Sequence, residues 1–130
     1  MKVIGILGRI LYGLPFIVFG TFHFFRTEGM AQGVLSGWPL ADVLVIITGI
    51  ALVLAGIAAV FKIQVRLAMI LLGILLFIFV VAIHLPGMIN AADQQAMQQS
   101  MNSLLKDLSL GGAAWFIASR YDMVNNPTDK

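Results

Sequence analysis

The sequence predicts an all-α integral membrane protein that folds as a four-helix bundle. Hydrophobic residues make up 60% of the chain and charged residues 11%, whereas soluble domains average about 45–50% and 25%. Four long apolar stretches predict membrane spans over about residues 3–25, 40–61, 66–85 and 104–121. No linker rich in Pro, Gly or Ser divides the chain, so we expect one domain over residues 1–130.

The first stretch follows Met1 and Lys2 directly, as the apolar part of a signal peptide would. It is too long for that role and has no small-x-small cleavage site before Arg26, so it predicts the first membrane helix. The second and third stretches are separated only by residues 62–64, and this short connection predicts an antiparallel hairpin.

The fourth span is preceded by a more polar segment. Glutamines alternate in it with apolar residues that recur near helical spacing. The apolar residues are Ala92, Met97, Met101, Leu104, Leu105 and Leu108. This pattern predicts a short amphipathic helix, either lying at the membrane interface or leading directly into the fourth span.

The basic residues predict the orientation of the bundle. Most of them fall at the end that holds both termini: Lys2, Arg9, Lys62, Arg66, Arg120 and Lys130. Only Arg26 and Lys106 fall at the other end. Because loops with an excess of Lys and Arg stay in the cytoplasm, both termini are predicted to be cytoplasmic.

Each span carries one stripe of small, aromatic and polar residues. The stripes are Arg9, Gly13, Phe16, Gly20 and His23; Asp42, Gly49 and Gly56; Arg66, Gly73, Phe77 and His84; and Asp107, Gly111, Ala114, Ala118 and Tyr121. Lipid provides no hydrophobic force between helices, so close packing of small residues must hold a bundle together. These stripes are therefore the predicted inner faces.

The stripes place ionisable residues at both ends of the predicted bundle. A candidate polar pocket lies at the outward end and consists of His23, Asp42, His84, Lys106 and Asp107. A second polar group lies at the cytoplasmic end and consists of Arg9, Arg66 and Tyr121. We predict that His84 lies within hydrogen-bond reach of Asp107, Lys106 or His23.

Each of these residues also has a structural interpretation. Arg9 and Arg66 could extend to the headgroups, which is common for basic residues near a helix end. Asp42 and Asp107 could cap the second and fourth helices. An isolated histidine near the interface could be a simple hydrogen-bond donor.

Composition limits the chemistry. A formal charge of +2 gives no indication of nucleic-acid binding, and without cysteine the chain can form no disulfide, iron–sulfur cluster or cysteine zinc site. Two histidines and two carboxylates could bind Zn²⁺ or Fe²⁺, but no His-x-x-x-His pair supports this, and we predict no metal site. The pocket could instead bind a quinone headgroup, or dock a partner protein or a lipid headgroup.

Several short segments resemble the DoxX family of small bacterial membrane proteins. They are residues 8–13 (GRILYG), 19–24 (FGTFHF), 48–52 (TGIAL), 66–68 (RLA), 84–87 (HLPG), 104–107 (LLKD) and 111–113 (GGA). Their order and spacing cover nearly the whole chain. The resemblance implies a four-helix protein of the bacterial inner membrane. Where many members carry a glutamate in the second span, residues 45–51 here are apolar and small.

The resemblance also implies a connection with redox proteins. Some DoxX-like proteins are associated with oxidoreductases, among them thiosulfate:quinone oxidoreductase subunits and a mycobacterial complex that links superoxide detoxification to thiol homeostasis. Related eukaryotic folds serve in receptor assembly and cargo export. We therefore expect a membrane subunit or adaptor for a membrane or periplasmic redox protein, which could also assemble with its own copies. The alternative is a quinone-interacting component of an oxidoreductase.

Overall fold

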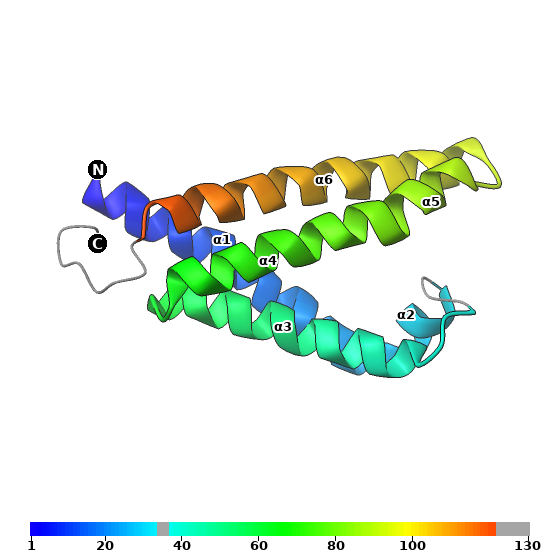
Figure 1. Ribbon diagram of the computed structural model, residues 1–130, viewed down its shortest axis with the longest axis horizontal. Helices are drawn as coiled ribbons and strands as arrows, with labels where there is room; N and C mark the ends of the chain where they lie inside the picture. Colours follow the sequence, from blue (N-terminus) through cyan, green and yellow to red (C-terminus); the bar gives the residue numbers. More distant parts are fainter. Residues whose placement is uncertain (34–36, 122–130) are drawn as a thin grey trace. The chain divides into compact units, whose positions relative to one another are not determined.

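The computed structural model describes residues 1–33 and 37–121, and the described chain is all-α, as predicted. The elements are α1 (Lys2–Phe25), α2 (Thr27–Gly33), α3 (Ala41–Phe61), α4 (Val65–Phe79), the π-helical turn η1 (Val80–His84), α5 (Leu85–Ile89) and α6 (Gln94–Ser119). They form two compact units (Figure 1), the first being Met1–Ala68 and the second beginning at Met69.

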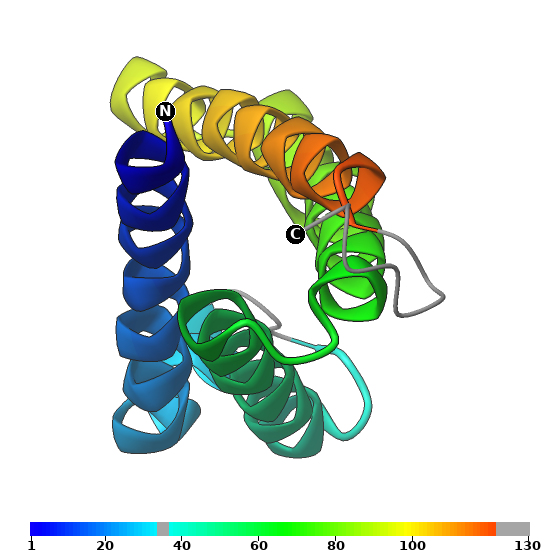
Figure 2. The same ribbon diagram turned by 90° about the vertical axis from the view of Figure 1, so that its left-hand side faces the viewer.

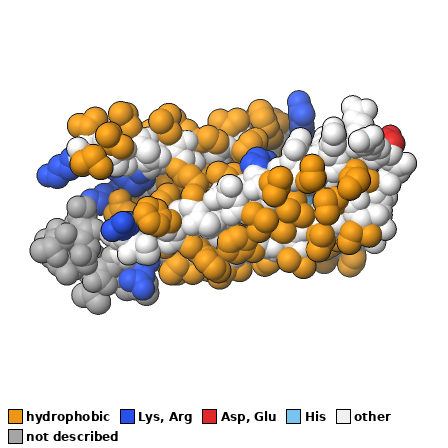
Figure 3. All heavy atoms as spheres, turned by 90° about the horizontal axis from the view of Figure 1, so that it is seen from above, with side chains coloured by type: hydrophobic (Ala, Val, Ile, Leu, Met, Phe, Trp, Pro, Cys, Tyr) orange, Lys and Arg blue, Asp and Glu red, His pale blue; other side chains and the backbone are white. Residues whose placement is uncertain are grey.

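Three helical segments among the described residues are long and apolar enough to cross a membrane. They are Lys2–Phe25, Ala41–Phe61 and Val65–Ile89, the last of which includes α4, η1 and α5. Large apolar side chains on them are exposed, as lipid contact requires (Figure 3). These features indicate a multi-pass membrane protein. The fourth span stays a prediction.

In the first unit, α1 and α3 run antiparallel and meet at two pairs of glycines. A Cβ atom added to Gly13 would lie 2.8 Å from the carbonyl oxygen of Gly56, and one added to Gly20 would lie 2.7 Å from that of Gly49. The glycines of each helix are two turns apart, so both pairs fall on one line of contact. The glycine stripes predicted for these two helices therefore face each other. Figure 2 shows the two helices, α1 in blue and α3 in dark green, side by side.

The connection between α1 and α3 contains a short helix that the sequence pattern did not predict. Thr27 begins α2, and its hydroxyl donates to the carbonyl oxygen of His23 at 2.6 Å. Leu40, just before α3, has a left-handed backbone with φ of 56°.

In the second unit, the third helix continues past the predicted end at Leu85. Pro86 has no backbone N–H and would break a regular α-helix. The helix widens before it into η1, where the Leu85 N–H donates to the carbonyl oxygen of Val80, five residues back. This π-turn allows the chain to stay helical as far as Ile89.

The predicted amphipathic helix leads directly into the expected fourth span, which is one of the two arrangements that the sequence pattern left open. Helix α6 begins at Gln94, where the carboxylate of Asp93 accepts the Ala96 N–H at 2.7 Å and caps the first turn. The amphipathic segment and the expected span are thus one continuous helix of 26 residues. Only residues 90–93 separate α5 from α6.

Large side chains on one helix of this hairpin fill the space beside glycines on the other. The ring of Phe77 on α4 lies against Gly111 of α6, and the indole of Trp115 on α6 lies against Gly73 of α4. The two rings meet edge to face with centroids 4.8 Å apart. The indole N–H donates to the carbonyl oxygen of Ile70 at 3.2 Å. This aromatic pair fixes the register of the two helices.

Candidate functional site

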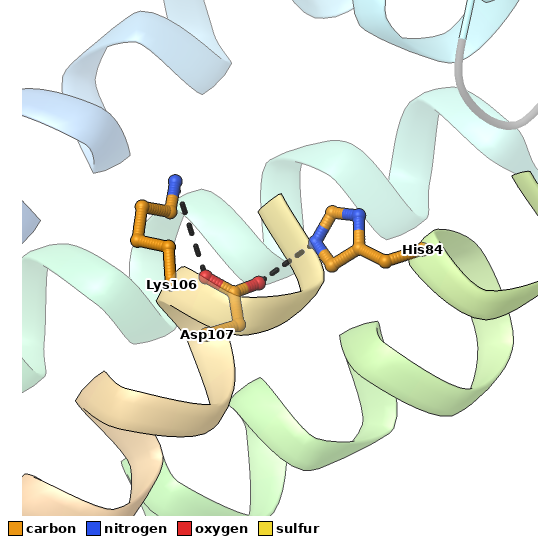
Figure 4. Close-up of polar contacts among 3 residues, drawn as sticks. All are labelled: His84, Lys106 and Asp107. Carbon is orange, nitrogen blue, oxygen red and sulfur yellow. Dashed lines mark hydrogen bonds and ion pairs between the residues drawn. The ribbon is translucent and has the colours of Figure 1, made fainter. Parts of the chain in front are cut away.

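The two helices of the second unit bring together a histidine and a carboxylate. His84 Nε2 lies 2.8 Å from Oδ2 of Asp107, and the two side chains point toward each other (Figure 4). The side chain of Asp107 is 7% exposed and that of His84 is 20% exposed. The prediction that His84 would reach Asp107 is confirmed.

The structural interpretation of Asp107 as a helix cap is wrong. The cap of α6 is Asp93, and Asp107 lies in the middle of the helix, far from the unpaired N–H groups of the first turn. Asp107 is the only buried charged residue among the described residues. Burying a carboxylate is costly unless it is paired, and its partner here is His84.

Lys106 is the third member of the site. Its Nζ lies 3.9 Å from Oδ1 of Asp107, so the carboxylate faces an imidazole on one oxygen and an ammonium on the other (Figure 4). The Lys106 side chain is 52% exposed. Such a half-exposed ion pair contributes less than about 1 kcal/mol to stability.

Because an ionised carboxylate only accepts hydrogen bonds, a hydrogen bond to ionised Asp107 needs the hydrogen of the His84 imidazole on Nε2. Nδ1 of His84 makes no hydrogen bond to another described residue. Every buried side-chain nitrogen or oxygen of the described residues does have a hydrogen-bond partner, so an atom without one is not buried. Nδ1 is therefore accessible. It can accept a hydrogen bond from a ligand, or donate one when the ring is protonated.

His23 and Asp42, which belong to the first unit, have different surroundings. His23 Nδ1 donates to the carbonyl oxygen of Phe19 at 2.7 Å, and its Cβ packs directly against Gly49. Asp42 is exposed in the first turn of α3, where its charge complements the positive end of the helix dipole. A pocket that joins these two residues to His84 stays a prediction.

Arg9 has a role that the sequence did not reveal. Its guanidinium donates to the carbonyl oxygens of Ala59 and, at 3.0 Å, Val60. These carbonyls lie in the last turn of α3, where no helical N–H is available to them. The positive charge also faces the negative end of the helix dipole. Arg9 thus caps a helix fifty residues away.

The Arg9 cap leads to a testable expectation. Replacing Arg9 by Met should lower the free energy of unfolding by about 2 kcal/mol, because two carbonyls lose a charged donor. Arg9→Lys keeps the charge and should lose less than Arg9→Met. Unfolding by SDS in mixed micelles, followed by circular dichroism, measures both. Equal stability of wild type and Arg9→Met would contradict the capping role.

The other two residues of the predicted cytoplasmic group lie at helix ends. Arg66 is in the first turn of α4, and Tyr121 follows α6, where its N–H donates to the carbonyl oxygen of Ala118. They belong to different units, and the proposed grouping of Arg9, Arg66 and Tyr121 stays a prediction.

The described residues offer no cluster of three or more His, Cys, Asp or Glu side chains that could hold a metal ion. The sequence pattern did not single out Trp115, which lies beside Phe77 and two turns from Asp107 on the same helix. A tryptophan in an apolar segment is an ordinary lipid-facing residue, so only its contact with Gly73 reveals its position.

Comparison with known proteins adds no assignment: a scan against protein-family models, a search of curated proteins and a search of solved structures each returned no match.

Proposed function

We propose that this chain is a DoxX-like membrane subunit that works with a redox partner and binds a quinone headgroup at His84 and Asp107. The observation that carries the proposal is the 2.8 Å contact between the His84 imidazole and the buried Asp107 carboxylate. Ionisable residues within membrane helices are rare and usually functional. The resemblance of short segments along the chain to DoxX-like proteins supports the redox association.

The chemistry of the pair suits both redox forms of a quinone. With a neutral ring, the accessible Nδ1 of His84 can accept a hydrogen bond from a quinol hydroxyl. With a protonated ring, Nδ1 can donate to a quinone carbonyl, and the Asp107 carboxylate offsets the positive charge. The Lys106 ammonium offers a further donor. Electrons would come from the redox partner, since none of the side chains at this site is redox-active.

The proposed topology places the site near one membrane surface. In this proposal α6 is the fourth span, both termini are cytoplasmic and the membrane is the bacterial inner membrane. His84 lies about 28 Å along the helix that begins at Val65, which is close to the far edge of a 30 Å hydrocarbon layer. A lipid-soluble quinone could reach it from the bilayer.

A second candidate function is a membrane adaptor that binds no cofactor. One observation favours it: Nδ1 of His23, a residue of the predicted pocket, already donates to the carbonyl of its own helix, as a structural histidine would. In this alternative the His84 and Asp107 pair only holds α6 in place, and a partner protein docks on the bundle.

Mass spectrometry of lipids extracted from gently purified protein tests the two functions. We expect quinone in the wild type and at least a tenfold loss in His84→Gln or Asp107→Asn, since both remove the charge-assisted hydrogen bond. Asp93→Asn is the matched control, because asparagine caps α6 as well as aspartate does. Wild-type protein without quinone but with a stoichiometric co-purified protein would support the adaptor and contradict quinone binding.

A further inference from the structure

The hairpin in which α6 packs against α4, η1 and α5 is polar on one side of the His84 and Asp107 pair. Toward residues 90–93, here called the tip, the packed face of α6 carries Ser103 and Ser100, four and seven residues before Asp107. Ser100 lies against α5, its Oγ 2.9 Å from where a Cβ on Gly87 would be. Both serines are half-buried and have no hydrogen-bond partner among the described residues, so their hydroxyls are accessible.

The same hairpin is apolar on the other side of the pair. Gly111 follows Asp107 by one turn and is covered by the ring of Phe77. Beyond it, Trp115 fills the space beside Gly73, and Ala114 is completely buried. Aromatic rings and methyl groups offer no site for a proton or a water molecule. The packing along the hairpin therefore changes from polar to apolar at Asp107.

We infer that the His84 and Asp107 pair exchanges protons with water on the tip side of the membrane, along the Ser100 and Ser103 face. Phe77 and Trp115 close the path to the opposite side. A proton from water adds to Nδ1 of His84, and the Asp107 carboxylate balances the imidazolium charge. The proton returns by the same path or passes to the bound ligand.

The neighbouring charges support this direction. Between Met69 and Ile89, His84 is the only ionisable residue, and on α6 the only ones between Gln94 and Ser119 are Lys106 and Asp107. The apolar side of the hairpin thus has no ionisable group, and its only hydroxyl before Ser119, that of Ser109, lies on another face of α6. The inference refines the proposed function, on which it depends only for the identity of the ligand.

The absence of natural cysteine allows a direct test with cysteines placed one at a time. Ser103→Cys and Ala114→Cys lie on the same face of α6, on opposite sides of Asp107. A membrane-impermeant cationic methanethiosulfonate would be added to either side of oriented proteoliposomes. Because only a hydrated thiolate reacts, Ser103→Cys should react at least about tenfold faster than Ala114→Cys, and from the tip side alone.

Two further variants separate the path from simple exposure. Ser109→Cys is exposed on another face of α6 and should react as slowly as Ala114→Cys, because lipid surrounds it. The double variant Phe77→Ala/Ala114→Cys should be labelled faster than Ala114→Cys alone, because the ring that closes the path is removed. Equal rates for Ser103→Cys and Ser109→Cys, or reaction of Ser103→Cys only from the other side or not at all, would overturn the inference.

The test is independent of quinone binding. Protein that lacks quinone but shows the expected labelling would contradict the proposed function and leave the proton path standing. Protein that holds quinone but reacts equally at Ser103→Cys and Ala114→Cys would contradict the path alone. Elution of each variant from size-exclusion chromatography at the wild-type volume shows that it is folded.

Discussion

Replacing His84 by leucine is expected to lower the free energy of unfolding by about 3 kcal/mol, because the buried Asp107 carboxylate loses its close partner. Asp107→Leu should cost a similar amount, since it leaves an unpaired imidazole between the helices. The double variant should be more stable than the sum of the two changes predicts, by at least about 1 kcal/mol, since it leaves no unpaired group.

A double-mutant cycle in bicelles, with unfolding measured by steric trapping, gives these three values. Lys106→Met is the matched control, because it removes a half-exposed charge 3.9 Å from the same carboxylate. It should cost less than about 1 kcal/mol. Additive effects of His84→Leu and Asp107→Leu would show that the two side chains do not interact in the folded protein.

Replacing Gly20 by leucine is expected to separate α1 from α3 and to lower stability by about 3 kcal/mol or more. Even a Cβ at Gly20 would lie 2.7 Å from the carbonyl oxygen of Gly49 and 2.9 Å from the backbone nitrogen of Val53. Backbone atoms cannot move aside as a flexible side chain can, so the helices must separate.

The control is a glycine of the same helix that has no neighbour. A Cβ at Gly8 would meet nothing within 4 Å, so Gly8→Ala should be neutral or slightly stabilising, because alanine favours the helix. SDS titration followed by circular dichroism compares the variants. Wild-type stability of Gly20→Leu would contradict the observed approach of the two backbones.

The sequence predicted those features that depend on a regular helical period. Glycines seven residues apart identified the faces of α1 and α3 that meet. In the same way, the predicted inner faces of the third and fourth helices included His84 and Asp107, which form a hydrogen bond. In each case, residues a whole number of turns apart stayed on one face. Lipid-exposed helices need such small-residue contacts, so the pattern is informative.

Features that depend on a local irregularity were missed. Pro86 normally indicates a helix end, but here the wider π-turn at Val80–His84 lets the helix continue past the proline. The residue types of this segment do not indicate that its turn contains an extra residue. The residue at which α6 begins could not be read from the sequence, because Asp93 lacks the glutamate or glutamine three residues later that completes a capping box.

The Arg9 contact was missed for a different reason. A basic residue near a helix end normally extends to the headgroups, and its sequence neighbours give no sign of another partner. Its acceptors, Ala59 and Val60, are backbone carbonyls fifty residues away, and any residue type could supply them. Contacts with backbone atoms leave no mark on the sequence of the partner segment.

The proposal that His84 binds a quinone headgroup while paired with Asp107 can be tested by ¹⁵N NMR of the imidazole in lipid bilayers. The chain has only two histidines, so His23→Gln leaves His84 as the single signal. Addition of a short-chain ubiquinone or menaquinone analogue should shift the Nδ1 resonance and leave Nε2 bonded to Asp107, and the shift should vanish in Asp107→Asn. An unchanged Nδ1 resonance at saturating concentrations of both analogues would contradict the claim.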